Sequence, residues 1–181
     1  MTDSPEALVF DTGPLRHFAV EGWLGVLHFL AGNRPVVIPD SVEAELRRQS
    51  HEVPVLKQVL DADWITVDRS TDLAYMVSFA AFADRLVEGG RNTGECGVLA
   101  LGKVRGFEIV LDDAVPRQIA HDEGIRVTAT LPLLCKAIRD GQLTLPMVES
   151  LADDLISGEY FLPFEQGGFR QWAVGEGLID Y

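Results

Sequence analysis

The sequence predicts a single α/β domain built on a mostly parallel sheet of about five strands. Short apolar runs rich in β-branched residues alternate with longer segments of helical periodicity, which is typical of parallel strands joined by helices. The strand candidates are almost continuously hydrophobic, as strands covered by helices on both faces must be. The length of 181 residues also lies close to the roughly 150 residues expected of one domain.

Five runs are predicted to be buried strands: residues 7–11, 35–38, 64–67, 107–112 and 125–128. Helices are predicted after the first and fourth of these strands, and also from capping residues at Ser41, Thr71–Asp72, Thr93 and Thr130. Residues from Pro146 onwards are predicted to be helical first and then aromatic and loop-rich. We expect residues 1–160 to form the domain and residues 161–181 to form a C-terminal extension, packed on the domain or used as an interface.

Cysteine content and hydropathy place the chain in a reducing compartment. Cys96 and Cys135 both lie in apolar runs and are predicted to be buried thiols rather than a disulfide. No run approaches the roughly 20 apolar residues of a membrane helix, and the first residues do not resemble a signal peptide. The sequence therefore predicts a cytoplasmic protein that does not contact a membrane.

The charge of the chain is strongly negative. There are 28 acidic residues against 15 Lys and Arg, which gives a net charge of −13. Such a balance normally argues against nucleic-acid binding, because Lys and Arg neutralise phosphate charge. A nucleic-acid ligand would require bound divalent cations or a local cluster of basic residues.

Acidic residues recur where strands are predicted to end. Asp11 closes the first strand, and Asp112 and Asp113 close the fourth, each before a helix. Glu45 and Glu95 lie in helices that begin near the same edge of the sheet. Ligands of open parallel sheets bind beyond the carboxyl ends of the strands. These five acids are therefore the candidate catalytic residues.

Each acid except Asp11 also has an ordinary structural interpretation. Glu95 can serve the helix dipole, Glu45 can be a solvated helix residue, and Asp112–Asp113 can cap a helix. Asp11 closes a buried strand and needs a partner there. Converging carboxylates repel one another unless they share protons or bind a hard cation, so the set favours Mg²⁺ or Mn²⁺.

Four segments carry a resemblance to a known family: VFDTGPLRHFA, IPDSVEAEL, NTGECGVLALG and IVLDDAVPRQIA. In order, spacing and strand–acid–helix context they resemble the acidic motifs of the PIN-domain superfamily. The later segment GIRVTATLPLLCKAIRDGQL resembles the stretch after the last acid in one bacterial and archaeal branch of that superfamily. The resemblance runs from about residue 7 to about residue 160.

The resemblance implies a flavodoxin-like three-layer α/β/α sandwich and Mg²⁺- or Mn²⁺-dependent hydrolysis of phosphodiester bonds, usually in RNA. It also implies kinship with VapC-like toxins, whose partner is a small antitoxin protein. The residues that it carries over as metal ligands are Asp11, Glu95, Asp112 and Asp113, with Glu45 as a further acid of the site. Thr12 is carried over as a hydroxyl that contacts substrate or a ligand. The acid pair leaves the final ligand open between Asp112 and Asp113, with a slight preference for Asp113.

Further substrate contacts are expected beside these acids. Thr93 and the N–H groups at the start of its helix are suited to anionic oxygen. Arg16, Arg91 and Arg117 are sequence neighbours of the proposed ligands and are predicted to form a basic rim that binds RNA. For each arginine alone, a salt bridge or simple solvation is an equal alternative.

Other functions fit the sequence less well. A non-catalytic PIN-like module that binds RNA or a protein should have lost an acid of the set, and none is missing. The triplet Asp11–Thr12–Gly13 occurs once and opens a helix, unlike the paired triplets of aspartic proteases. Phosphoryl-aspartate enzymes of the dehalogenase type would have a second Asp where Gly13 stands.

The aromatic residues of the tail leave two interpretations open. They are expected to cap the core or to form a dimer or antitoxin surface: Phe161, Phe164, Phe169 and Trp172. Stacking on RNA bases is less favoured, because the surrounding residues are not basic.

Overall fold

The computed structural model describes residues 6–87 and 92–180. Five strands form one parallel sheet in the order β3-β2-β1-β4-β5, which confirms the predicted α/β class. At the centre of the sheet, Val9 of β1 is in register with Val37 of β2 and Ile109 of β4. The strands are β1 (Leu8–Phe10), β2 (Val36–Pro39), β3 (Ile65–Asp68), β4 (Glu108–Val110) and β5 (Val127–Thr128).

The helices alternate with these strands along most of the chain. They are α1 (Thr12–Val20), α2 (Leu24–Ala31), α3 (Asp40–Gln49), the 3₁₀ helix η1 (Pro54–Leu56), α4 (Lys57–Leu60), α5 (Leu73–Leu86), α6 (Thr93–Arg105), α7 (Ala114–Asp122), α8 (Thr130–Arg139), α9 (Leu145–Ser157) and α10 (Phe169–Gly175).

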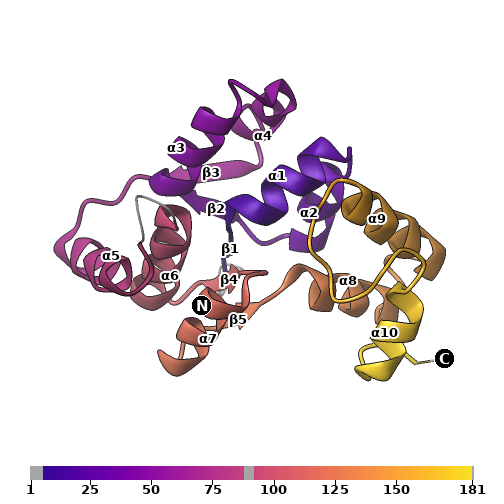
Figure 1. Cartoon of the computed structure of the whole chain (residues 1–181). Coiled ribbons are helices and arrows are strands. Elements are labelled where there is room, and N and C mark those ends of the chain that lie inside the picture. The colour runs from indigo at the N-terminus through magenta and orange to yellow at the C-terminus, as the bar shows by residue number, and fades with distance from the viewer. Residues whose placement is uncertain (1–5, 88–91, 181) are drawn as a thin grey trace.

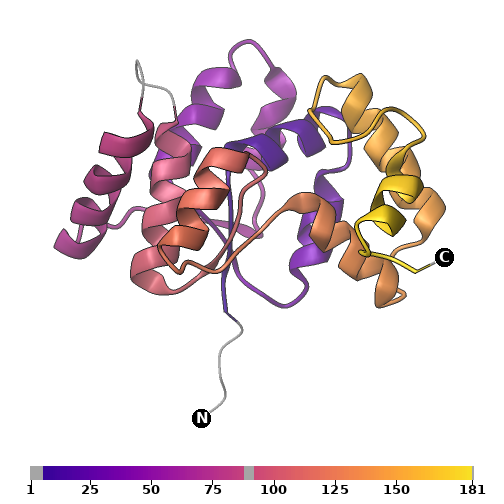
Figure 2. The same cartoon turned by 60° about the horizontal axis from the view of Figure 1, so that its bottom comes forward.

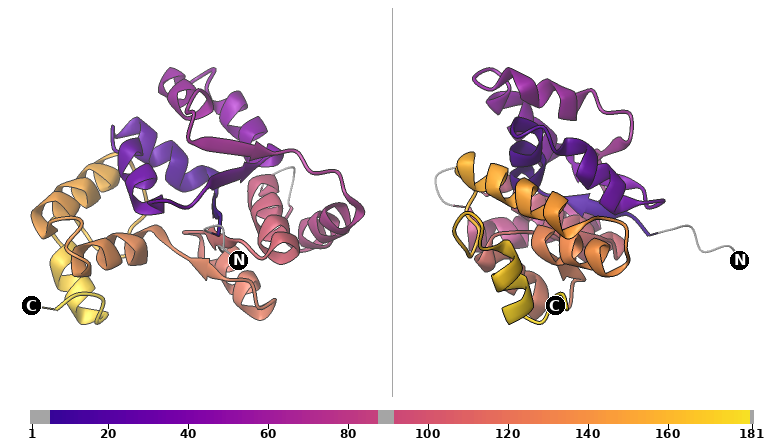
Figure 3. Two further views of the ribbon diagram at one scale, coloured as in Figure 1. Left: turned by 180° about the vertical axis from the view of Figure 1, so that it is seen from behind. Right: turned by 90° about the vertical axis from the view of Figure 1, so that its right-hand side faces the viewer.

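The sheet lies between two helical layers. Figure 1 shows α1 and α2 on one side of the sheet and α6 and α7 on the other. Helix α6 packs directly on β1, β2 and β4 and is covered in turn by α5, whereas α1 contacts α2, α3 and α4. The views from the front and from behind agree that α8, α9 and α10 gather at one end of the molecule and α5 at the other (Figures 1 and 3).

The core follows the sequence pattern in the central strands but not at the edges. All residues of β1 and β2 are buried, including Phe10 and Ile38. Strands β3 and β5 were predicted to be buried as well, and this was wrong: most of their residues are only half-buried. Each is an edge strand with a neighbour on one side only. Cys96 and Cys135 are buried with free thiols, as predicted.

Three of the sequence-based helix starts need correction. Only Asp72 is confirmed as a side-chain cap: its Oδ1 accepts a hydrogen bond from the Tyr75 N–H at 3.1 Å. Ser41 is the second residue of α3, and Thr93 and Thr130 are the first residues of α6 and α8, so none of the three is the cap of its helix. Helices α2 and α10 were not predicted, because neither is preceded by a capping side chain. Within the described part of the chain, no helix is both long and apolar enough to cross a bilayer.

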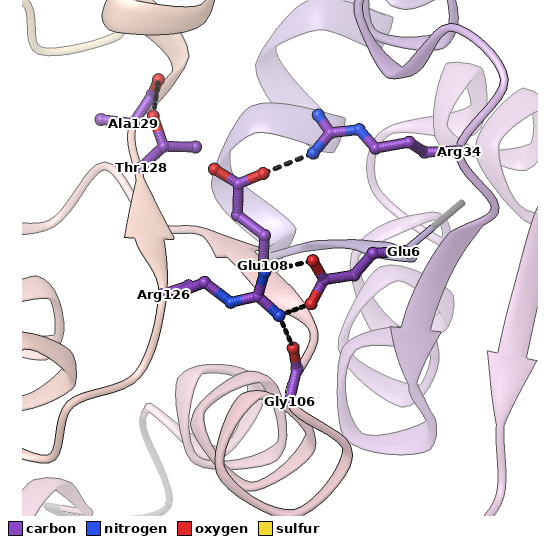
Figure 4. A network of polar contacts seen from close by, with 7 residues as sticks. All are labelled: Glu6, Arg34, Gly106, Glu108, Arg126, Thr128 and Ala129. Atoms are coloured by element: carbon purple, nitrogen blue, oxygen red, sulfur yellow. Dashed lines mark hydrogen bonds and ion pairs between the residues drawn. The ribbon is translucent and has the colours of Figure 1, made fainter. Parts of the chain in front are cut away.

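Ion pairs link the segments at the amino ends of the strands (Figure 4). Arg34, before β2, pairs with Glu108 of β4, and Arg126, before β5, pairs with Glu6, before β1. The Arg126 guanidinium also donates to the Gly106 carbonyl. These contacts are partly exposed and contribute little stability each. They occupy the edge of the sheet opposite the one that carries the clustered acids.

The C-terminal segment has its own aromatic cluster. The ring centroid of Phe164 lies 5.8 Å from that of Phe169 and 5.2 Å from that of Trp172. Phe169 is fully buried, and α10 packs against α9. Figure 2 shows α10 lying beside α9, with the loop that joins them running over the same end of the molecule. Phe161 is the exception, with 91% of its surface exposed.

Candidate active site

Asp11 is the buried centre of the acidic cluster. It follows β1 and occupies the N-cap position of α1, with only 7% of its surface exposed. Its Oδ1 atom is buried without a hydrogen-bond partner among the described residues. Burial raises the pKa of Asp11 well above its ordinary value, and the carboxylates of Glu95 and Glu45 raise it further. The backbone N–H groups of Thr12 and Gly13 lower the pKa but do not offset this rise. A buried carboxylate oxygen without a partner is costly, so its presence here needs an explanation.

Glu45 is held in place from α3. Its Oε2 accepts a hydrogen bond from Thr12 Oγ1 at 2.9 Å, and its Oε1 accepts one from Gln49 Nε2 at 3.3 Å. Arg16 Nη1 donates to Gln49 Oε1 at 2.9 Å. The first turn of α1 and the last turns of α3 are thereby joined around the carboxylate.

Glu95 reaches the same cluster from the first turn of α6. Its carboxyl group is half-buried, and burial raises its pKa, with Glu45 and Asp113 acting in the same direction. Helix α6 can approach this closely because residue 94 is glycine. A Cβ atom at Gly94 would lie 2.8 Å from Glu45 Oε2, 3.2 Å from Thr12 Oγ1 and 3.3 Å from Asp11 Oδ1. Thr93 begins α6 beside these groups and is half-buried.

Asp112 and Asp113 have different surroundings although they are adjacent. The Asp112 carboxylate accepts hydrogen bonds from Thr130 N at 2.7 Å and from Thr130 Oγ1 at 2.6 Å. It also accepts one from the Tyr160 hydroxyl. Asp113 is exposed at the N-cap position of α7, makes no side-chain capping bond and acts electrostatically on Glu95.

Tyr160 is a site neighbour that the sequence did not reveal. Burial and the Asp112 carboxylate raise its pKa, so the hydroxyl stays protonated and donates. Its ring centroid lies 4.4 Å from that of His17 on α1. It follows α9 and is 48 positions from Asp112 in sequence, so no local pattern could indicate this contact.

The predicted basic residues are partly engaged with the protein itself. Arg16 donates to Gln49, and Arg117 Nη1 donates to the carbonyls of Leu111 at 3.2 Å and Asp112 at 2.7 Å. Arg117 therefore braces the corner between β4 and α7. Arg91 lies outside the described residues.

The donor set is suited to a hard cation. Asp11, Glu45, Glu95 and Asp113 provide only oxygen atoms, and oxygen ligands are what Mg²⁺ and Mn²⁺ prefer. The unpartnered Oδ1 of Asp11 and the Oε2 of Glu45 both lie close to the backbone of α6 at Gly94. In residues 6–87 and 92–180, however, no three His, Cys, Asp or Glu side chains are already arranged to enclose a metal ion. The residue types and the electrostatics fit such an ion, and the side chains would have to close around it.

Comparison with known families agrees with this arrangement. A family model described as a PIN domain, DUF3368, matches residues 7–166. The chain belongs to this PIN-domain family. PIN domains are generally nucleases that use divalent metals, and the matched range includes all five acids and Tyr160. No curated protein matches the chain.

Proposed function

We propose that this PIN domain is a metal-dependent endoribonuclease that hydrolyses phosphodiester bonds in RNA. The observation that carries the proposal is the buried Asp11 carboxylate, whose Oδ1 lacks a partner beside two further acids. A folded protein retains such a costly group when it binds something positive there. A non-catalytic PIN-like module remains the alternative, and the complete set of acids argues against it.

The proposed roles follow from the positions of the side chains. Asp11, Glu95 and Asp113 would hold Mg²⁺ or Mn²⁺, with Asp112 as a further candidate ligand. When bound, the metal supplies Lewis-acid chemistry, because it makes water more acidic and offsets charge on the phosphate. Glu45 orients Thr12 through their hydrogen bond. The Thr12 and Thr93 hydroxyls and the free N–H groups at the start of α6 would position the phosphate oxygens.

Cleavage is expected to require Mg²⁺ or Mn²⁺ and to stop when EDTA removes the metal. Binding should also raise the melting temperature, since the ion relieves repulsion among the acids and binds only the folded state. A fluorescently labelled RNA oligonucleotide and thermal melts with and without Mn²⁺ provide the two measurements. Cleavage that continues in EDTA would contradict the proposal.

Substitution of Gly94 by alanine is expected to lower RNA cleavage by about ten- to a hundredfold, because small displacements of catalytic groups have effects of this size. The new Cβ would lie 2.8 Å from Glu45 Oε2 and force the carboxylate to move. Folding should be retained, since alanine favours helix by up to about 1 kcal/mol. Gly25→Ala in α2 is the matched control, because its Cβ would meet no heavy atom within 4 Å. Unchanged cleavage by Gly94→Ala would argue against a site at this position.

Replacing Arg16, Arg91 and Arg117 together with alanine is expected to weaken RNA binding while affinity for Mn²⁺ changes little. Binding should also depend steeply on salt and on the divalent cation, since a surface of net charge −13 repels phosphate. Binding is measured by fluorescence anisotropy over a range of salt concentrations. Arg117→Ala needs a separate thermal melt, because Arg117 also braces two backbone carbonyls.

The control for this experiment replaces three exposed basic residues of α8 and α10 that lie outside the proposed rim: Lys136, Arg139 and Arg170. Equal RNA affinity of the triple-arginine variant and the wild type would contradict the prediction and would show that other parts of the chain bind the RNA.

A toxin role is a second proposal, carried by the resemblance of residues 124–143 to the VapC-like branch. A small antitoxin encoded by the adjacent reading frame would then bind this chain. Growth arrest on expression, relieved by co-expression of that neighbour and absent in Asp11→Asn, tests the role separately from cleavage.

A further inference from the structure

A cavity of about 760 Å³ lies directly beside the acidic cluster. Asp112 and Asp113 line it, and so do Tyr160, Phe161 and Trp172 from the C-terminal segment. Val127, Leu131 and Leu155 belong to its apolar wall. A volume of this order is ordinary for a small-molecule site. The C-terminal segment thus lines the same cavity as two of the proposed catalytic acids.

Phe161 is exposed in an unusual place. Single exposed hydrophobic residues on a surface need no explanation by themselves. Phe161, however, is 91% exposed while it lines the cavity, whereas Phe164, Phe169 and Trp172 pack on one another. An exposed aromatic ring at the mouth of an apolar cavity is available for stacking on a planar ligand.

Asp113 lines two cavities, and this position suggests the path of a bound RNA strand. A second cavity of about 400 Å³, lined by Asn92 and Glu95, shares Asp113 and Ala114 with the larger one. A single RNA strand whose phosphate lies at the acids would therefore have room for a nucleotide on each side. Single-stranded RNA is recognised mainly by stacking of unpaired bases on aromatic residues and by hydrogen bonds to their edges.

We propose that the larger cavity binds one unpaired nucleobase of the RNA, next to the phosphate that is cut. This inference rests on the proposed ribonuclease function and adds a determinant of where the RNA is cut. Phe161 stacks on the base, and the polar groups of His121 and Thr128 in the cavity wall are available for its edges. A base is uncharged, so an acidic protein can bind it without binding phosphate. The sequence disfavoured base stacking by the tail, because basic residues are absent around it. Binding of an uncharged base in the cavity does not require basic residues, so this objection does not apply to Phe161.

Neutral nucleosides are the probe that separates this site from the metal site. Adenosine, guanosine, cytidine and uridine are titrated into the wild type in EDTA, with indole fluorescence and NMR as readouts, since Trp172 lines the cavity. At least one nucleoside should bind, with a dissociation constant on the order of 1 mM. Phe161→Ala should weaken it about tenfold, the scale of one stacking contact, whereas Phe29→Ala, an exposed aromatic residue of α2 outside this cavity, should not.

Cleavage of RNA provides the second measurement. Phe161→Ala should cleave with a weaker preference for sites next to the base that binds best, while its dependence on metal is unchanged. Phe161→Trp, which keeps an aromatic ring, should cleave with the preference of the wild type. If the wild type cuts RNA but binds no nucleoside and Phe161→Ala cuts the same sites equally well, the inference is wrong and the cavity is left to a protein segment. If nucleosides bind as expected but no RNA is cut with either metal, the base site is supported and the ribonuclease proposal fails.

Discussion

Replacing Asp11 with asparagine is expected to abolish Mn²⁺ binding and to lower RNA cleavage by about a hundred- to a thousandfold, the range seen when a group acting directly on the transition state is lost. The substitution removes one negative charge from the centre of the cluster and places asparagine, a favoured N-cap residue, at the N-cap position of α1. The domain should therefore stay folded. Calorimetric titration with Mn²⁺ and the oligonucleotide assay measure the two losses.

The same variant is expected to be at least as stable as the wild type in the absence of divalent cations, and the difference should grow with pH. Burial raises the pKa of Asp11 above its ordinary value of 3.8. Between the two values the folded state holds a proton that the unfolded state has released, so stability falls as pH rises through this window. Asparagine does not titrate, so the stability of the variant should decline less over the same range.

Asp84→Asn is the matched control, because Asp84 is exposed on α5 and does not belong to the acidic cluster. It should change neither metal binding nor the pH dependence of unfolding. An Asp11→Asn protein that still cleaves RNA would remove Asp11 from the mechanism, and one that melts well below the wild type would show that the carboxylate stabilises the fold.

The sequence predicted the strands and the acids because both depend on local patterns. Buried parallel strands require continuous apolar runs, and the position directly after such a run is the carboxyl end of a strand. Asp11 and Asp113 could therefore be located from their neighbours alone. Gly94 is also a sequence neighbour of Glu95. The need for a glycine there could not be predicted, because it arises from the close approach of α6 to Glu45 of α3 and to Thr12 of α1.

The contacts of the C-terminal segment could not be predicted, because they depend on tertiary packing. Tyr160 reaches Asp112 across 48 positions, and no periodicity relates residues so far apart. The tail was expected to be loop-rich, yet α10 forms because Phe169 and Ala173, one turn apart, are buried against the rest of the protein. The uneven exposure of Phe161 and its aromatic neighbours likewise follows from packing rather than composition.

Asp112→Asn and Asp113→Asn are expected to fail in different ways. Asp113 is exposed and acts on Glu95, so its loss should weaken Mn²⁺ binding and RNA cleavage while the free energy of unfolding changes by less than about 0.5 kcal/mol. Asp112 accepts bonds from Thr130 and from Tyr160. Asparagine has only one carbonyl oxygen and no charge, so it cannot accept all of these hydrogen bonds. The free energy of unfolding should therefore fall by about 2–3 kcal/mol.

A thermal melt separates the two variants. For a domain of this size, each 1 kcal/mol corresponds to roughly 2–4 °C, so Asp112→Asn should melt about 4–12 °C lower and Asp113→Asn close to the wild type. Tyr160→Phe provides an independent check, because it removes one of the same hydrogen bonds and leaves every acid in place. Its effect on stability should be largely absent when Asp112 is already asparagine.

The difference between the two acids has a geometric cause. Adjacent residues at the end of a strand point in different directions, so they seldom serve the same ion. Asp112 points towards α8 and Tyr160, where it fixes the C-terminal segment to the sheet, and Asp113 points to the side of Glu95. Asp112→Asn should thus lower cleavage chiefly because the C-terminal segment is held less firmly near the site. Cooling or a stabilising solute should recover part of the lost cleavage. Equal losses of cleavage with equal melting temperatures would show instead that both carboxylates are ligands.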